Sequence, residues 1–389
     1  MRRFIGPALL ALALAAAHPA AAQKPKSPDT PMILTWSPEL QSKGYRTMED
    51  LFEVQVIKRG RKVHPLPAAA KAIDVAYPYE GKTWTTADYM AAFDVSGVLV
   101  LKDGKVLLER YAMGRKPEDR WTSFSVAKSV TSTLVGAAIA DGKIKGLNSA
   151  VTDYIPELKG SGYDGVTVRQ LLMMSSGVKW NEDYTDPKSD VATAGTTIED
   201  PKVNPIVSYM RKLPRENAPG TVFNYNTGET DLVGVLVSNA VGKSLSEYAS
   251  EKIWKPYGME RDGVWVTDMA GHERGGCCMS MTLRDYGRVG QFILDGGKAG
   301  RKQILPPGWS TEATTKQIEN GTGGYGYFWW IRPQGGYEAR GIFGQGIMIV
   351  PEERLVIVAN SAWPRATGRD LSAARTAFYE AIRAAAKAN

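Results

Sequence analysis

The chain has 389 residues, of which 43% are hydrophobic and 9% aromatic, so it can bury a large core and is neither a linker nor a low-complexity protein. Its formal charge of +7 falls to +5 without Arg2 and Arg3, which lie in a predicted leader. This small excess of basic residues is dispersed along the chain, so we expect no nucleic-acid partner.

Residues 1–22 are typical of an export signal. Arg2 and Arg3 precede a short Ala/Leu run at 8–17, and the alanines at 20–22 offer an A-x-A cleavage site. The run is about half of the roughly 20 apolar residues that cross a bilayer. We therefore expect a cleaved signal peptide, no stable membrane insertion, and a periplasmic or secreted protein that begins near Gln23.

Residues 23–94 carry scattered prolines and little periodicity, which predicts an extended arm with one short helix near 86–92. The apolar runs 97–101 and 105–111 flank a central Asp-Gly pair. This pattern is a strong indication of a β-hairpin. The hairpin is expected to open a sheet.

Apolar residues recur at helical spacing over 125–140, and Gly142 follows where a left-handed helix cap is expected. Further helices are predicted at 168–174, 232–241, 283–294 and 373–386. Strands are predicted at 324–331, 347–350 and 355–359.

Strands and a helix at both ends of the chain, with helices between them, predict an α/β (α+β) fold. We expect an antiparallel sheet flanked by helices, formed by residues 95–145 and 297–389. Residues 146–296 are predicted to form a mostly helical insertion domain.

The two cysteines, Cys277 and Cys278, are adjacent, and neighbouring residues cannot easily adopt normal disulfide geometry. We therefore expect stability to come from packing. After loss of the leader only His64 and His272 remain, and both are interpreted as structural or solvated. Neither a Ser/His/Asp triad nor a zinc site is therefore indicated, and the absence of a serine at the centre of a G-x-S-x-G motif argues against an α/β-hydrolase. No metal or organic cofactor is expected.

A serine hydroxyl is a weak nucleophile at neutral pH and needs a base in contact with it. The sequence SVAK at 125–128 supplies one, because positions i and i+3 share a helix face with Cβ atoms about 5–6 Å apart. The helix start also offers unpaired N–H groups and a positive dipole end to an oxyanion. We predict Ser125 as the nucleophile and Lys128 as its base, kept uncharged by burial and a nearby cation.

The S-x-x-K motif is weak by itself, and SGVK at 176–179 is a second example. Gly177 inside it and Asn181 after it predict a helix end, where the i, i+3 register is lost. For Ser125, a capping serine beside a solvated lysine remains the structural alternative.

Several stretches, in the right order, resemble those of class C β-lactamases and their esterase and peptidase relatives. The residues that carry the resemblance are DYIPEL at 153–158, VTVRQLL at 166–172, SG at 176–177, FNY at 223–225, LVG at 232–234 and GIFGQ at 341–345. The FNY stretch is similar to the family's Y-x-N element, and GIFGQ falls where the K-T-G strand belongs. The resemblance spans about residues 97–386, and its combined order is more specific than any one motif.

The resemblance implies that Tyr225 is a second acid/base that relays a proton between Ser125 and the leaving group. A phenol beside a lysine amine is expected to have a lowered pKa. A buried core tyrosine is the structural alternative. The resemblance also implies an oxyanion hole formed by the backbone N–H groups of Ser125 and Ile342.

Two motifs depart from the class C pattern. The K-T-G lysine and threonine align with Ala339 and Arg340, and the Asn of Y-x-N aligns with Thr227. Loss of the lysine removes a cation expected to hold a β-lactam carboxylate. Efficient β-lactam hydrolysis is therefore not expected unless Arg340 substitutes.

Met174, the segment 181–187 and the GIFGQ strand instead resemble the 6-aminohexanoate-dimer hydrolases, which cleave a linear amide and retain esterase activity. This resemblance implies Tyr184 as a substrate-pocket residue, with a plain loop aromatic as the alternative. Thr227, Gly341 and Gly344 are expected in the same pocket. Gly275 and Gly276 either line the cleft or form a turn.

The leading interpretation is a secreted serine hydrolase that cleaves small linear amides or esters through a Ser125 acyl-enzyme. A D-amino-acid peptidase or a weak β-lactamase is an alternative on the same machinery. A non-catalytic cell-wall sensor is the alternative from another class, although such relatives often lack the serine or lysine that this chain retains. The expected partner is a small-molecule amide or ester, and no oligomeric state is predicted.

Overall fold

The computed structural model describes residues 24–27 and 29–388. The predicted leader at 1–22 lies outside these residues. In the described part of the chain, no helix combines the length and apolar character needed to cross a membrane.

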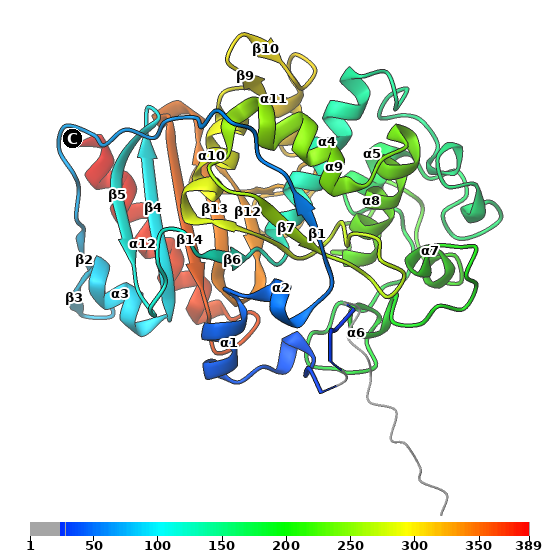
Figure 1. Ribbon diagram of the computed structural model, residues 1–389, viewed down its shortest axis with the longest axis horizontal. Helices are drawn as coiled ribbons and strands as arrows, with labels where there is room; N and C mark the ends of the chain where they lie inside the picture. The colour runs from blue at the N-terminus through cyan, green and yellow to red at the C-terminus, as the bar shows by residue number, and fades with distance from the viewer. Residues whose placement is uncertain (1–23, 28, 389) are drawn as a thin grey trace, which may run out of the picture.

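The larger sheet is antiparallel and joins strands from distant parts of the chain. Its strands are β4 (Val95–Lys102), β5 (Lys105–Tyr111), β11 (Trp330–Ile331), β12 (Tyr337–Gly341), β13 (Gln345–Val350) and β14 (Leu355–Ser361). The order across the sheet is β11-β12-β13-β14-β4-β5, and the labels β5, β4, β14, β13 and β12 follow one another from the left to the centre of Figure 1. The predicted hairpin and the predicted antiparallel sheet are both confirmed.

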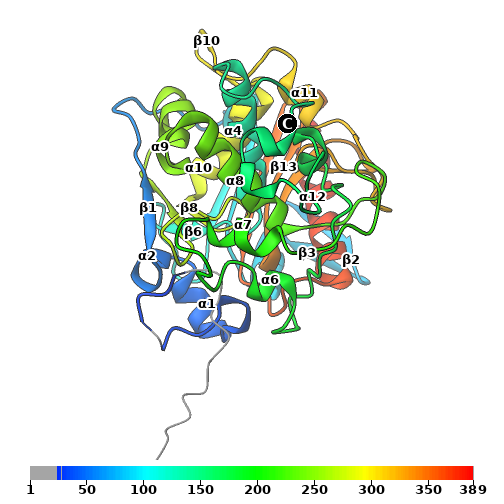
Figure 2. The same cartoon turned by 90° about the vertical axis from the view of Figure 1, so that its right-hand side faces the viewer.

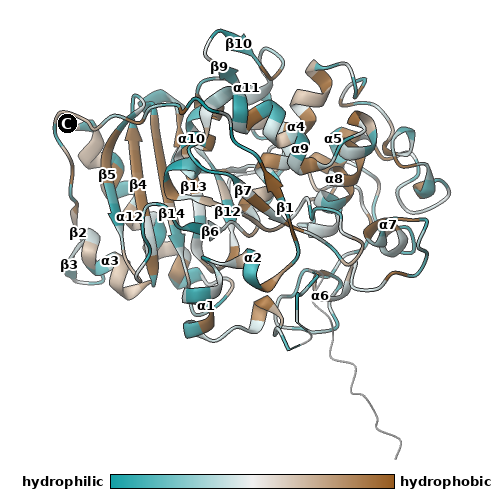
Figure 3. Cartoon of the chain, in the orientation of Figure 1, coloured by the Kyte–Doolittle hydropathy of each residue, from teal (hydrophilic) through white to brown (hydrophobic). Residues whose placement is uncertain are grey.

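Helices cover both faces of this sheet. Because side chains alternate along a strand, Val356 packs in the cluster that contains α10 (Leu283–Leu294), and Ile357 packs in the cluster that contains α12 (Arg369–Lys387). A strand covered on both faces is apolar throughout, and the central strands are brown in the hydropathy colouring of Figure 3. Both helices confirm the sequence prediction.

The division of the chain at residues 146 and 296 stays a prediction, but α10 lies within that segment and packs on the large sheet. Gly290 permits the close approach, because a Cβ there would lie 2.5 Å from Val356 Cγ1. The mostly helical segment therefore contributes one covering helix to the sheet.

A smaller sheet lies beside the catalytic region. It has the order β1-β7-β8-β6, with β1 (Val54–Ile57), β6 (Arg120–Thr122), β7 (Gly263–Val266) and β8 (Met279–Thr282). The prediction of an arm with one helix is wrong apart from α3 (Thr86–Ala92). The arm also contains α1 (Pro38–Gly44), α2 (Met48–Leu51), β2 (Ala76–Tyr79) and β3 (Lys82–Thr85). Four-residue segments carry too little periodicity to be recognised, and β1 is completed by pairing with distant β7.

The remaining helices lie mainly on the side away from α12, at the right of Figure 1 and facing the viewer in Figure 2. They are α4 (Val126–Ala140), α5 (Val168–Leu172), α6 (Asp190–Thr193), α7 (Pro205–Met210), α8 (Thr227–Val241) and α9 (Leu245–Ala249). The short elements β9 (Lys298–Ala299), β10 (Lys302–Gln303) and α11 (Trp309–Ala313) follow α10. The helix predicted at 125–140 is confirmed, and Gly142 has the expected left-handed backbone, with a φ of 68°.

The strand predicted over 324–331 is wrong except at its last two residues, which form β11. Phe328 has a φ of 62° and Gly324 a φ of 111°, and neither angle is compatible with an extended strand. The backbone of this segment turns, and its aromatic side chains before β11 are buried in the core.

Candidate active site

Ser125 lies at the N-cap of α4, directly after β6. The segment before it is fixed to β8, because Met279 N–H donates to Ser123 Oγ (2.9 Å) and Ser123 N–H donates to the Met279 carbonyl (2.7 Å). Ser125 is only 9% exposed. Strand pairing and a buried helix therefore hold the serine in one place at a helix start.

Lys128 lies one turn further along the same face of α4. Its amine donates to Ser125 Oγ (3.1 Å), Thr227 Oγ1 (3.0 Å) and the Gly276 carbonyl (2.8 Å). Only 1% of the residue is exposed. The amine is thus held against the serine hydroxyl by acceptors from two other parts of the chain.

The surroundings of Lys128 disfavour its charged form. Burial lowers the pKa of Lys128 to about 8, the carboxylates of Glu182 and Asp231 oppose this shift, and Arg274 adds to it. The expected burial and nearby cation are both present. A substantial fraction of the amine is therefore uncharged just above neutral pH.

The helix α8 begins five residues before the predicted start at residue 232. Asn226 caps it by accepting a hydrogen bond from Glu229 N–H (2.9 Å), which places Thr227 in the first turn. The first turn is polar, so apolar periodicity does not reveal it. This cap places Tyr225 and Thr227 on either side of Asn226, at the same end of α8.

Tyr225 lines the same cavity as Ser125, and its ring stacks on Trp330 with 5.4 Å between ring centroids. Lys128 Nζ lies 5.4 Å from the centroid of the Tyr225 ring. The prediction of a lowered phenol pKa is wrong. Burial raises the pKa of Tyr225 well above 10, the Glu182 carboxylate raises it further, and interaction with the Ser125 side chain opposes the shift. The phenol is therefore protonated at rest.

Glu182, which sequence reasoning did not single out, connects several of these groups. The Thr227 hydroxyl and the Trp180 indole N–H donate to its carboxylate, as do Thr227 N–H (3.0 Å) and the Tyr184 hydroxyl (2.9 Å). Thr227 thus bridges Lys128 and Glu182 through one hydroxyl group. The sequence signal was only the resemblance of segment 181–187, which carries no geometry.

A buried ion pair supports the carbonyl that holds Lys128. Asp231 accepts from Arg274 Nε (2.8 Å) and from Gly276 N–H (2.8 Å), and both charged side chains are almost fully buried. At Gly276, a Cβ would lie 2.8 Å from Thr227 Cγ2 and 3.1 Å from Lys128 Nζ. Gly276 therefore lines the site, whereas Gly275 packs against the Thr230 carbonyl of α8.

Two cavities meet at Ser125. One is mostly apolar and is also lined by Ile33, Phe124, Tyr184, Thr227, Cys277 and Ile342. The other is lined by Glu182, Tyr184, Tyr225, Arg340, Gly341 and Arg375. The expected pocket residues Tyr184, Thr227 and Gly341 thus lie at the cleft.

The end of β12 passes next to Ser125. At Gly341, a Cβ would lie 2.5 Å from the Ser123 carbonyl, so only glycine fits there, and Ile342 follows beside Ser125. The strand predicted at GIFGQ ends at Gly341 and turns, with a φ of 57° at Phe343. This turn points Gly344 toward Trp363, and Gly344 does not line either cavity that contains Ser125.

The second S-x-x-K sequence lies outside a helix, as predicted. Ser176 donates to the buried carboxyl of Glu229, and Lys179 pairs with Glu216 at the surface. His64 stacks on Tyr257 with 4.5 Å between ring centroids.

Cys277 and Cys278, whose adjacency in the sequence does not favour normal disulfide geometry, form a disulfide. The turn after Gly276 brings the adjacent sulfur atoms together, an arrangement that spacing alone did not favour. Among residues 24–27 and 29–388, no group of three or more His, Cys, Asp or Glu side chains is placed to hold a metal ion.

Comparison with known proteins agrees with this geometry. The Beta-lactamase family model matches residues 85–381. A 6-aminohexanoate-dimer hydrolase of Paenarthrobacter ureafaciens is 35% identical over 284 residues, which are 68% of this chain and 72% of that protein. A solved structure described as a candidate 6-aminohexanoate-dimer hydrolase from Bacillus anthracis has a TM-score of 0.75 at 25% identity, and the match covers 89% of this chain and 93% of that chain. A family VIII carboxylesterase shares the fold, with a TM-score of 0.57 at 16% identity over 76% of this chain and 96% of that chain.

The chain belongs to the beta-lactamase family. It is a hydrolase, and its antiparallel sheet flanked by helices is the fold of that family, as the sequence resemblance implied. Arg340, which the sequence resemblance aligns with the threonine of the K-T-G motif, lies at the end of β12. Its Nε donates to the buried Glu338 (2.5 Å), and its guanidinium lies 5.4 Å from the Trp330 ring centroid.

Proposed function

We propose that this hydrolase cleaves small linear amides or esters through an acyl-enzyme on Ser125. The observation that carries the proposal is the contact of a buried amine, whose pKa is about 8, with a serine hydroxyl 3.1 Å away at a helix start. A serine needs such a base to become nucleophilic.

In the first step, the Ser125 hydroxyl gives its proton to the uncharged Lys128 amine while its oxygen bonds to the substrate carbonyl carbon. The oxyanion lies between the backbone N–H groups of Ser125 and Ile342. Tyr225 then donates its hydroxyl proton to the leaving nitrogen or oxygen, and the bond to that atom breaks. The Lys128 ammonium returns a proton to the phenolate.

Deacylation repeats the sequence with water. Lys128 accepts a proton from water while the water oxygen bonds to the acyl carbon. The Lys128 ammonium then gives a proton to Ser125 Oγ as the bond to the acyl carbon breaks, and the acid product is released. The raised pKa of Tyr225 supports its role as the proton donor and Lys128 as the resting base.

The two cavities support a linear substrate with its carbonyl at Ser125 and one arm in each. The apolar cavity suits an alkyl chain, and the other offers the charges of Glu182, Arg340 and Arg375. The 6-aminohexanoate dimer, the compound named for the Paenarthrobacter relative, has an amine and a carboxylate at opposite ends of alkyl chains. A linear amide of this kind is the first substrate to test.

A fluorophosphonate probe with intact-mass readout tests the nucleophile. Wild type and Ser176→Ala, the matched serine of the second S-x-x-K sequence, should each gain one phosphonyl group, and Ser125→Ala should gain none. Labelling of Ser125→Ala would remove Ser125 as the nucleophile. Turnover of p-nitrophenyl esters and linear amides, compared with nitrocefin, then separates the amidase/esterase from a β-lactamase.

We further propose export, based on the leader at residues 1–22. Fractionation of cells that produce the full chain, followed by mass determination of the mature N-terminus, tests this. A product that retains residues 1–22 in the cytoplasm would refute it.

A further inference from the structure

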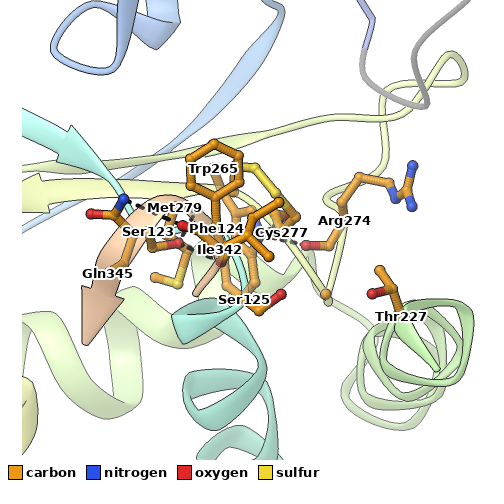
Figure 4. The surroundings of a disulfide bond; sticks show 12 residues. Ser123, Phe124, Ser125, Thr227, Trp265, Arg274, Cys277, Met279, Ile342 and Gln345 are labelled. Carbon is orange, nitrogen blue, oxygen red and sulfur yellow. Dashed lines mark hydrogen bonds between the residues drawn. A yellow bond between two sulfur atoms is a disulfide. The ribbon is translucent and has the colours of Figure 1, made fainter. Parts of the chain in front are cut away.

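The disulfide between Cys277 and Cys278 lies at the catalytic site rather than at a distant structural position. Cys277 is partly exposed and lines the apolar cavity together with Ser125 and Ile342. Figure 4 shows these three residues gathered together, with Thr227 across from them. Gly276, whose carbonyl accepts from the Lys128 amine at 2.8 Å, directly precedes the disulfide.

The Gly276 carbonyl and the Cys277 N–H belong to one rigid peptide unit. The orientation of the carbonyl oxygen toward Lys128 therefore depends on the backbone angle at Cys277. On its N–H side this peptide unit donates to the Arg274 carbonyl (3.2 Å). Gly275 and Gly276 have no side chains of their own, so backbone hydrogen bonds hold this turn: Gly276 N–H donates to Asp231 (2.8 Å), and the Thr131 hydroxyl donates to the Gly275 carbonyl (2.7 Å).

Cys278 is the fixed end of the pair. It is fully buried, and its carbonyl accepts from Val266 N–H (3.1 Å) in the sheet that contains β8. Met279 follows and exchanges hydrogen bonds with Ser123, two residues before the nucleophile. The disulfide ties Cys277 to this frame, and without it the Cys277 side chain is free to rotate into the cavity it lines.

We propose that the Cys277–Cys278 disulfide is a positioning element of the catalytic site, which holds the Gly276 carbonyl against the Lys128 amine. The proposal rests on the proposed role of Lys128. Its consequence is that a dithiol reductant lowers turnover while the fold remains intact.

Reduction is a balanced exchange. A thiolate of the dithiol attacks Cys277 Sγ, the protein S–S bond breaks, and Cys278 leaves as a thiolate that takes up a proton. The second thiol of the reagent then closes on the mixed disulfide and releases the Cys277 thiol. The protein gains two electrons and two protons, and the dithiol becomes a cyclic disulfide.

The chain contains two cysteines, so the Cys277–Cys278 bond is the one disulfide within the chain that a reductant can break. The experiment measures kcat and KM on a p-nitrophenyl ester for oxidised protein, for dithiothreitol-reduced protein, and for Cys277→Ser/Cys278→Ser. Alkylation followed by intact-mass measurement establishes the state of the thiols, and circular dichroism establishes the fold.

Reduction and the double variant should each lower kcat by roughly 10- to 100-fold, as expected for a misplaced catalytic group, with a smaller change in KM. Reoxidation should restore kcat in the wild type. Dithiothreitol should have no effect on the double variant, which is the matched control.

The acid limb of the kcat profile gives a readout that a purely structural role would not move. Loss of the carbonyl dipole removes stabilisation of the Lys128 ammonium, so this limb should move to lower pH. The neighbouring charges of Glu182, Asp231 and Arg274 are unchanged by reduction.

The outcomes separate the two proposals. An inactive oxidised protein, or a Lys128→Ala variant that retains full activity, would contradict the proposed function. With that function intact, an unchanged kcat and pH profile after verified reduction would overturn the positioning role. Two thiols that are already free in the exported protein would overturn it as well.

Discussion

Replacing Glu182 with glutamine removes a carboxylate that lies one hydroxyl group away from the amine of Lys128, the proposed base. Thr227 bridges the two, since Lys128 donates to Thr227 Oγ1 (3.0 Å) and that hydroxyl donates to Glu182. Two hydrogen-bond steps place the charges about 5 Å apart. At an effective dielectric constant of about 20, their attraction is about 3 kcal/mol. This attraction stabilises the ammonium form.

One pKa unit corresponds to about 1.4 kcal/mol, so the full attraction would be about 2 pH units. Glu182 is half-buried, and solvent screening reduces this value. We expect Glu182→Gln to lower the pKa of Lys128 by about 1 to 2 units. Glutamine can be accommodated, because its oxygen accepts from the two N–H donors and its amide group donates to the two hydroxyls.

The assay is the pH dependence of kcat on a p-nitrophenyl ester. The amine must be uncharged to act as a base, and burial lowers the pKa of Lys128 to about 8, so wild-type kcat should fall as the pH drops below about 8. In Glu182→Gln this acid limb should lie at lower pH. Asp183→Asn removes the same charge from an exposed neighbouring position and should leave the limb in place. A limb that stays fixed in Glu182→Gln, or moves to higher pH, would refute the electrostatic reasoning.

Two other substitutions test separate parts of the site. Tyr225→Phe keeps the ring stacked on Trp330 but removes the proposed proton donor. We therefore expect kcat to fall by roughly 10²- to 10⁴-fold, with no large change in the free energy of unfolding. A kcat within a factor of two of wild type would exclude the phenol as the acid. Asp231→Asn leaves the buried Arg274 cation uncompensated and should lower the free energy of unfolding by about 3–5 kcal/mol in urea titrations, and a further Arg274→Met change should recover part of this loss. Additive losses in the double variant would contradict a coupled ion pair.

Short-range signals determined much of the framework. The Asp-Gly turn defined the hairpin that became β4 and β5, and apolar periodicity defined α4, α10 and α12. The same helical spacing placed Ser125 and Lys128 on one face. These features depend on residues a few positions apart, so the sequence by itself determines them.

Contacts between distant segments were decided only by the tertiary structure. Glu182 precedes Thr227 by about 50 residues, and Gly276 follows it by about 50. All three nevertheless lie around Lys128. The direction of the Tyr225 pKa shift depended on how much solvent the packed chain removes from the phenol, which outweighs its neighbours. The disulfide of adjacent cysteines likewise depended on a turn fixed by β7, β8 and α8. Local spacing sets which side chains share a helix face, whereas burial and long-range charge are properties of the folded chain.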